Sequence, residues 1–177
     1  MKSYDDYVAE LAIKHRETAA FWHLVYSGEA ALPAVRRGLS SRDPKIRRDC
    51  TRVLDHLVNE DSWPELIAMV GDKDPNVRAW ALHSLACDRC KENSCRPDKF
   101  EVMLRALSAM QTDPVAGVRS MAVEVVARWV YDDADAEAAL IDARDNDPDP
   151  GVRKKAGWFC PGGVRYEKKK PKARARQ

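Results

Sequence analysis

Asp43-Pro44-Lys45-Ile46-Arg47 and Asp74-Pro75-Asn76-Val77-Arg78 are two copies of one motif, Asp-Pro followed by Val or Ile and then Arg. The motif returns as Asp113-Pro114-Val115-Ala116-Gly117-Val118-Arg119 and as Asp149-Pro150-Gly151-Val152-Arg153. Counted from arginine to arginine, the copies are 31, 41 and 34 residues apart. A recurrence with such a period is the sequence signature of stacked supersecondary units.

The motif predicts where helices begin. An Asp side chain accepts hydrogen bonds from the free N–H groups at a helix start, and Pro suits the first helical position because it has no N–H to leave unpaired. Apolar residues before and after each copy fall at helical spacing. The predicted helix pairs are 29–39 with 44–59, 62–71 with 75–88, 98–111 with 115–131, and 135–145 with 150–159.

Two apolar helices joined by Asp-Pro-x-Val-Arg resemble the HEAT-repeat superfamily, and more narrowly the short HEAT-like repeats common in bacterial proteins. The resemblance implies an all-α fold, a right-handed α-solenoid of about four HEAT-like helix pairs. Residues 1–27 are expected to form an N-terminal helical cap, residues 28–163 the solenoid, and residues 164–177 a basic, disordered tail.

The repeats can be aligned with one another on the Val or Ile of the motif. Four positions later they carry the small residues Cys50, Ala81, Ala122 and Ala156. Eight positions later they carry Leu54, Leu85, Val126 and Cys160. Small residues permit close helix approach and aliphatic residues fill a core, so both columns are expected to be buried.

Charge is distributed unevenly along the chain of 177 residues. The net charge is +2, but the 13 residues from Arg165 to Gln177 carry +6 and the remainder carries −4. No apolar run approaches the roughly 18 residues that a membrane span needs. The N-terminus lacks the basic and then apolar layout of a secretion signal, so a cytoplasmic location is expected.

Three cysteines and one histidine are grouped around the second repeat: His83, Cys87, Cys90 and Cys95. His83 and Cys87 are four residues apart and share a helix face, and Cys87 and Cys90 form a Cys-x-x-Cys step. Three thiolates and one imidazole are a ligand set for structural zinc. Inert thiols, with a surface histidine, are the alternative interpretation, and redox use is a third. A disulfide is disfavoured in a reducing cytoplasm.

Polar residues dominate the positions six and ten after the Val or Ile, and these positions are expected to face solvent or a partner. At the position three residues after the motif Val or Ile, two repeats carry the apolar residues Trp80 and Met121, and the other two carry charged residues. The two apolar residues predict either an interface patch or packing against residues 90–97. The candidate partner-binding residues are Trp80, Met121, Arg48, Arg52, Glu124 and Arg128. The motif arginines are expected to form ion pairs with Asp43, Asp74, Asp113 and Asp149 rather than a phosphate-binding row.

The favoured function is a non-catalytic interaction module that binds a protein partner, with zinc as the one possible cofactor. Nucleic-acid binding is the alternative. HEAT-like DNA glycosylases use a basic groove, whereas positive charge here is concentrated in the tail, at Lys168, Lys169, Lys170, Lys172, Arg174 and Arg176. An enzyme is disfavoured: HEAT-like iron hydroxylases use His-Glu pairs, and no His in this chain precedes Glu. Bilin lyases also use short HEAT-like repeats, but no residue identifies a chromophore site.

Overall fold

A computed structural model describes residues 2–57, 62–86 and 99–169 of the chain, and regular structure within these ranges is helical throughout. The chain forms two compact units, Met1–Val102 and Met103–Gln177, with the division inside helix α7. No helix in the described ranges is both long enough and apolar enough to cross a membrane.

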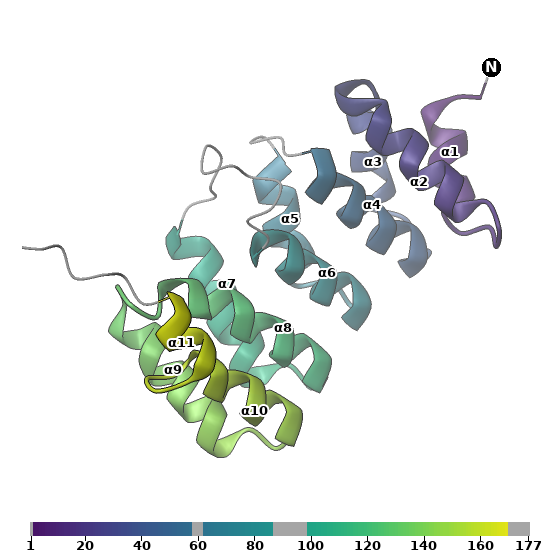
Figure 1. Cartoon of the computed structure of the whole chain (residues 1–177). Helices are drawn as coiled ribbons and strands as arrows, with labels where there is room; N and C mark the ends of the chain where they lie inside the picture. Colours follow the sequence, from purple (N-terminus) through teal and green to yellow (C-terminus); the bar gives the residue numbers. More distant parts are fainter. Residues whose placement is uncertain (1, 58–61, 87–98, 170–177) are drawn as a thin grey trace, which may run out of the picture. The chain divides into compact units, whose positions relative to one another are not determined.

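Unit 1 is built from helix pairs (Figure 1). The pairs are α1 (Tyr4–Glu10) with α2 (Glu17–Tyr26), α3 (Leu32–Gly38) with α4 (Pro44–Leu57), and α5 (Trp63–Met69) with α6 (Pro75–Ala86). A short 3-10 helix, Gly28–Ala31, leads into α3. The second helices of successive pairs pack on one another, α2 against α4 and α4 against α6, which is the stacking that defines a solenoid.

Unit 2 repeats this arrangement. Helix α7 (Lys99–Thr112) precedes α8 (Ala116–Val126) and a 3-10 turn (Ala127–Trp129), and α9 (Ala134–Asn146) precedes α10 (Pro150–Phe159). Helix α10 packs against both α9 and α8. The α-solenoid of helix pairs expected from the sequence is therefore observed.

The two chain termini compare differently with the sequence expectation. Residues 4–26, within the expected helical cap, form the helices α1 and α2, with a Ser3–Asp6 capping box at their start. Residues 164–169, expected to be disordered, form helix α11 (Val164–Lys169). The turn before α11 requires glycine, because Gly162 has a φ of +82° and a Cβ on Gly163 would lie 2.2 Å from the Gly157 carbonyl oxygen. The rest of the expected tail, 170–177, lies outside the described residues.

The two apolar columns of the repeat alignment form the core. Their side chains, Cys50, Ala81, Ala122 and Ala156 together with Leu54, Leu85, Val126 and Cys160, are at most 2% exposed. Small residues are needed where α3 meets α4, because a Cβ on Gly38 would lie 2.3 Å from the Cys50 sulfur. The expectation of close helix approach at this column is confirmed.

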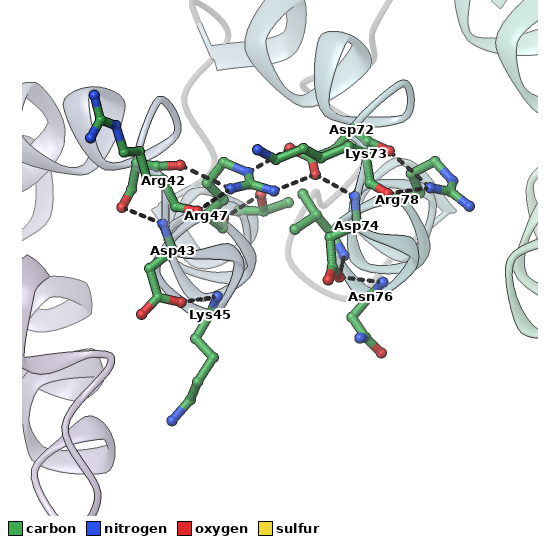
Figure 2. A network of polar contacts seen from close by, with 12 residues as sticks. Arg42, Asp43, Lys45, Arg47, Asp72, Lys73, Asp74, Asn76 and Arg78 are labelled. Carbon is green, nitrogen blue, oxygen red and sulfur yellow. Dashed lines mark hydrogen bonds and ion pairs between the residues drawn. The ribbon is translucent and has the colours of Figure 1, made fainter.

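The Asp-Pro motif performs the predicted capping. Asp43 accepts a hydrogen bond from the Lys45 amide, and Asp74 accepts one from the Asn76 amide, each 2.8 Å long (Figure 2). Asp149 likewise accepts from the Gly151 amide at 2.8 Å. These aspartates are therefore committed to helix starts, which leaves the motif arginines to find other acidic partners.

Arg47 pairs with Asp72, an acid in the loop of the next helix pair and not in its own (Figure 2). Its Nε and Nη2 donate to the two carboxylate oxygens at 2.7 and 2.8 Å. Its Nη1 donates to the carbonyl oxygens of Ser41 and Arg42 in the preceding loop. One guanidinium thus joins two consecutive repeats, with side chains that are only 4% and 8% exposed.

Arg119 makes the equivalent contacts in unit 2. Its Nε and Nη2 donate to Asp147 at 2.8 and 2.9 Å, and its Nη1 donates to the Asp113 carbonyl oxygen. The prediction that Asp43 and Asp113 are the ion-pair partners was therefore wrong. The observed partners, Asp72 and Asp147, each lie two residues before the Asp-Pro of the next motif. We call the Arg47–Asp72 and Arg119–Asp147 pairs the arginine ladder.

Pairing alters the ionisation of both acids. Burial alone would raise the pKa of Asp72, but the hydrogen bonds from Arg47 and from the Asp74 amide outweigh it and hold that pKa below its ordinary value. Asp147 has a lowered pKa for the same reasons, with Arg119 and the Asp149 amide as donors. Both carboxylates are stabilised as anions in the folded chain.

Replacing Asp147 with Asn should destabilise the chain by about 3 kcal/mol, because it leaves the buried Arg119 guanidinium without a counter-charge. The measurement is the free energy of unfolding in urea. Asp145→Asn is the matched control, since Asp145 forms an exposed pair with Arg144 and should change stability little. Equal effects of the two substitutions would contradict a structural role for the ladder.

Acid should remove the contribution of the ladder. The folded-state pKa of Asp147 is lowered, so its stabilisation is complete above the unfolded pKa of about 3.9 and is lost as pH falls through the lower folded value. The stability difference between wild type and Asp147→Asn should therefore be constant near neutral pH and shrink below about pH 4. Urea unfolding at a series of pH values measures this, and a difference that persists unchanged in acid would argue against it.

Candidate interaction surface

The second helices of the three pairs in unit 1 present a continuous surface. Helices α2, α4 and α6 pack in sequence, and their core columns face the first helices of the pairs. Side chains six and ten positions after the motif Val or Ile are half-buried or exposed, as expected, at Arg52, His83 and His56. This face is where the candidate site lies.

Arg52 of α4 is at the centre of the surface. Its guanidinium carbon lies 4.7 Å from the ring centroid of Phe21 on α2 and 4.7 Å from that of Trp80 on α6. A guanidinium over an aromatic face is held by a cation–π interaction. One arginine therefore bridges three successive helix pairs through ring contacts on both sides.

Aromatic contacts continue from Arg52 in both directions. The His56 ring lies 5.6 Å from Phe21 and 5.5 Å from Trp22, and Trp22 stacks on Tyr26 at 5.7 Å. On the other side, Trp80 meets His83 edge to face at 5.0 Å. We call this surface the aromatic–cation row; it consists of Phe21, Trp22, Tyr26, Arg52, His56, Trp80 and His83.

The row is accessible at the α2 end. Trp22 is 41% exposed and Tyr26 is 83% exposed, whereas Phe21 is 5% exposed and anchors the row to the core. Large aromatic side chains exposed side by side are uncommon unless they bind something. The row therefore has the composition of a binding surface on a packed base.

A single buried acid orients the positive charges. Asp49 is 3% exposed; it accepts two hydrogen bonds from Arg48, at 3.0 and 2.8 Å, and one from Nη1 of Arg52, at 2.9 Å. The hydrogen bonds with Asp49 raise the pKa of Arg48 above its ordinary value. Two guanidinium groups share this carboxylate, so the three side chains together carry one positive charge.

The structure brings together only some of the predicted partner-binding residues. Arg48, Arg52 and Trp80 lie together in unit 1 as described. Met121, Glu124 and Arg128 belong to unit 2, so a joint patch of Trp80 and Met121 stays a prediction. Glu124 forms an ion pair with Lys155 at 2.6 Å.

The α2 members of the row, Phe21, Trp22 and Tyr26, are absent from the sequence prediction, because residues 1–27 contain no Asp-Pro motif to mark the repeat register. The sequence does contain the register: Ala20 and Leu24 are 1% and 0% exposed and occupy the small and aliphatic columns. Aligning them with Cys50 and Leu54 places Trp22 beside Arg52 and Tyr26 beside His56 in the two polar columns.

Of the predicted zinc ligands, His83 lies on α6, and Cys87, Cys90 and Cys95 lie outside the described residues. Within 2–57, 62–86 and 99–169, no three His, Cys, Asp or Glu side chains gather as a metal site. The sequence prediction of zinc is therefore untested by the structure.

The predicted nucleic-acid tail is described only in part. Lys168 and Lys169 are exposed on α11, and Lys170, Lys172, Arg174 and Arg176 lie outside the described residues. Helix α11 is fixed to the last pair by Arg165, whose guanidinium lies 5.5 Å from the rings of Trp158 and Phe159. The Tyr131 hydroxyl also donates to the Tyr166 carbonyl oxygen.

Unit 2 contains a groove of about 420 Å³ between α7 and α9. Its lining includes Met110, Gln111 and Asp142, together with Arg119 and Asp147. Arg119 and Asp147 form an ion pair with each other, so the groove borders the arginine ladder.

Comparison with known proteins agrees with this architecture. The family model described as HEAT repeats matches residues 32–108, which span α3 to α7. No curated protein matches the sequence.

Solved structures with the same fold were found at low sequence identity. A chain from the complex of CpcE and CpcF of phycocyanin lyase from Nostoc sp. PCC7120 superposes with a TM-score of 0.70 at 18% identity, covering 86% of this chain and 95% of that chain. A designed armadillo repeat protein in complex with the peptide (KR)4 superposes with a TM-score of 0.54 at 14% identity, covering 89% and 80% of the two chains. Residues 32–108 are therefore similar to HEAT repeats, and the helix pairs of the chain share an α-solenoid fold with these solved structures.

Proposed function

We propose that the chain is a non-catalytic protein-interaction module that binds its partner through the aromatic–cation row. The observation that carries the proposal is the unbroken series of ring contacts from Tyr26 to His83, centred on Arg52. Tyr, Trp and Arg are the residues that contribute most binding energy in protein interfaces. The row combines all three types on one face.

Rigidity supports the same conclusion. A side chain that is already held in place loses less conformational entropy on binding, and an ordered surface binds more tightly for the same contact area. Phe21 and Asp49 are buried and hold Arg52 in a fixed position between two rings. The centre of the row is therefore organised before any partner arrives.

The fold is suited to an extended partner, because stacked helix pairs produce a long surface that each repeat extends by one helix. The designed armadillo repeat protein with a similar fold was solved with a peptide bound. By analogy of fold, we propose that the partner of this chain contacts α2, α4 and α6 with an extended segment.

Selection of short random peptides displayed on phage against the immobilised chain tests the proposal. Peptides enriched on wild type should bind at least about tenfold more weakly to the Trp22→Ala and Tyr26→Ala variants, as expected for interface anchors. The measurement is fluorescence anisotropy with labelled synthetic peptides.

Leu104→Ala is the control for this experiment, because Leu104 is 57% exposed on α7 and lies outside the row. It should leave binding unchanged. Enriched peptides that bind the Trp22 and Tyr26 variants as tightly as wild type would place the interaction surface elsewhere.

We also propose, from the sequence, that His83, Cys87, Cys90 and Cys95 hold a structural zinc ion. Purified chain should then contain about one zinc per molecule by mass spectrometry, and Cys90→Ser should lose it. Cys50→Ala is the matched control: burial, with the nearby Asp49 charge, raises the pKa of the Cys50 thiol to about 12, so it does not supply a thiolate. Wild type purified without zinc would end this proposal.

A further inference from the structure

Two N–H groups of the Arg52 guanidinium are available to bind a ligand. Its central carbon lies 4.7 Å from the ring centroids of Phe21 and of Trp80, and Nη1 donates to Asp49. Its Nε and Nη2 have no hydrogen-bond acceptor among the described residues, and the side chain is 34% exposed. The edge that bears Nε–H and Nη2–H has the planar geometry that binds a carboxylate through two parallel hydrogen bonds.

Within helices α2, α4 and α6, no exposed acid lies beside Arg52. Helix α6 contains no Asp or Glu, and those of α4 are Asp49 and Asp55, which are 3% and 6% exposed. The acid of α2, Glu17, is in its first turn, while the row occupies the second half of that helix. The first helices of the pairs do carry acids that pair with arginines: Arg37 pairs with Asp5, and Arg36 pairs with Glu65.

Resting on the proposed function, we propose that Arg52 is the carboxylate-binding anchor of the aromatic–cation row. The partner is an extended peptide that places an Asp or Glu side chain on Arg52 and apolar side chains on Trp22, Tyr26 and Trp80. Arginine binds carboxylates better than lysine at such a site because its fork is planar and rigid and it stacks on rings. The two ring contacts fix that fork, so the ordering cost of the long side chain is already met in the free chain.

The charge count favours a peptide over a nucleic acid. Arg48 and Arg52 share Asp49, so the two guanidinium groups leave an excess of one positive charge. Nucleic-acid binding depends on several phosphate contacts from Lys and Arg. A single carboxylate between apolar side chains matches the row better than a run of phosphates.

The test uses labelled pools of short peptides, acetylated and amidated at their ends, with Glu at every second position and Phe, Leu, Pro or Trp between. A matched pool carries Gln in place of Glu. Anisotropy should show the Glu pool binding wild type about tenfold more tightly than the Gln pool, and more weakly as salt is added. Arg52→Lys should remove this preference, so that the Glu pool binds the variant no more tightly than the Gln pool does.

Arg37→Lys is the control for charge-preserving substitution, because Arg37 lies on α3 and pairs with Asp5. It should leave both pools unchanged. Equal binding of the two pools, weakened by Trp22→Ala, would overturn the acidic partner and keep the proposed function. Binding of neither pool would count against both.

Two further probes separate other sources of negative charge. A Gln pool with free C-termini that binds as tightly as the Glu pool would assign Arg52 to a terminal carboxylate instead. A labelled single-stranded oligo-dT that binds more tightly than the Glu pool, with loss in Arg52→Lys, would assign the row to nucleic acid. Either result overturns the proposal.

Discussion

Consecutive repeats of this chain are held in register by a buried arginine that bonds to two loops at once. Arg47 donates to carbonyl oxygens of the loop between α3 and α4, and to the carboxylate of Asp72 in the loop between α5 and α6. Apolar burial between helices is non-directional and tolerates some sliding. A bidentate ion pair between planar groups does not, so the arginine ladder fixes the α3/α4 pair on the α5/α6 pair, and the α7/α8 pair on the α9/α10 pair.

That register sets the positions of Arg52 on α4 and Trp80 on α6 within the aromatic–cation row. The ring contacts of Arg52 reach from α2 to α6, so they require three helix pairs to be stacked at the correct height. A shift of one helical turn, about 5.4 Å, would separate Arg52 from both rings. The candidate binding surface is therefore a property of the stack and not of any one repeat.

The repeat motif predicted the solenoid, the helix starts and the buried columns, because capping and helical periodicity are local properties of sequence. It predicted the wrong partner for Arg47, since the Asp of its own motif is already occupied by the amides of the helix start. An acid two residues before Asp-Pro, present at Asp72 and Asp147, was the available signal for the correct one. Local sequence does not distinguish Asp43 from Asp72 as the partner of Arg47; the packing of one helix pair on the next does.

The candidate site was harder to predict than the fold. Trp80 and Arg52 stood out in the repeat alignment, but Phe21, Trp22 and Tyr26 come from α2, which has no Asp-Pro motif before it to mark the register. Helix α11 was missed because its sequence is highly charged, and its place depends on contacts with Tyr131 and Trp158 that are distant in sequence. Composition indicates whether a segment can form a core of its own, but not whether it can pack on an existing one.

The ladder is also directional along the chain. Arg47 is synthesised 25 residues before Asp72, and Arg119 is synthesised 28 residues before Asp147. A repeat that has just left the ribosome therefore still lacks the carboxylate that its arginine needs. In the last pair, Arg153 donates to the carbonyl oxygens of its own loop, Asp147 and Pro148. Trimming the chain from its C-terminal side would strand a buried cation, whereas trimming it from the N-terminal side would strand an anion at a loop.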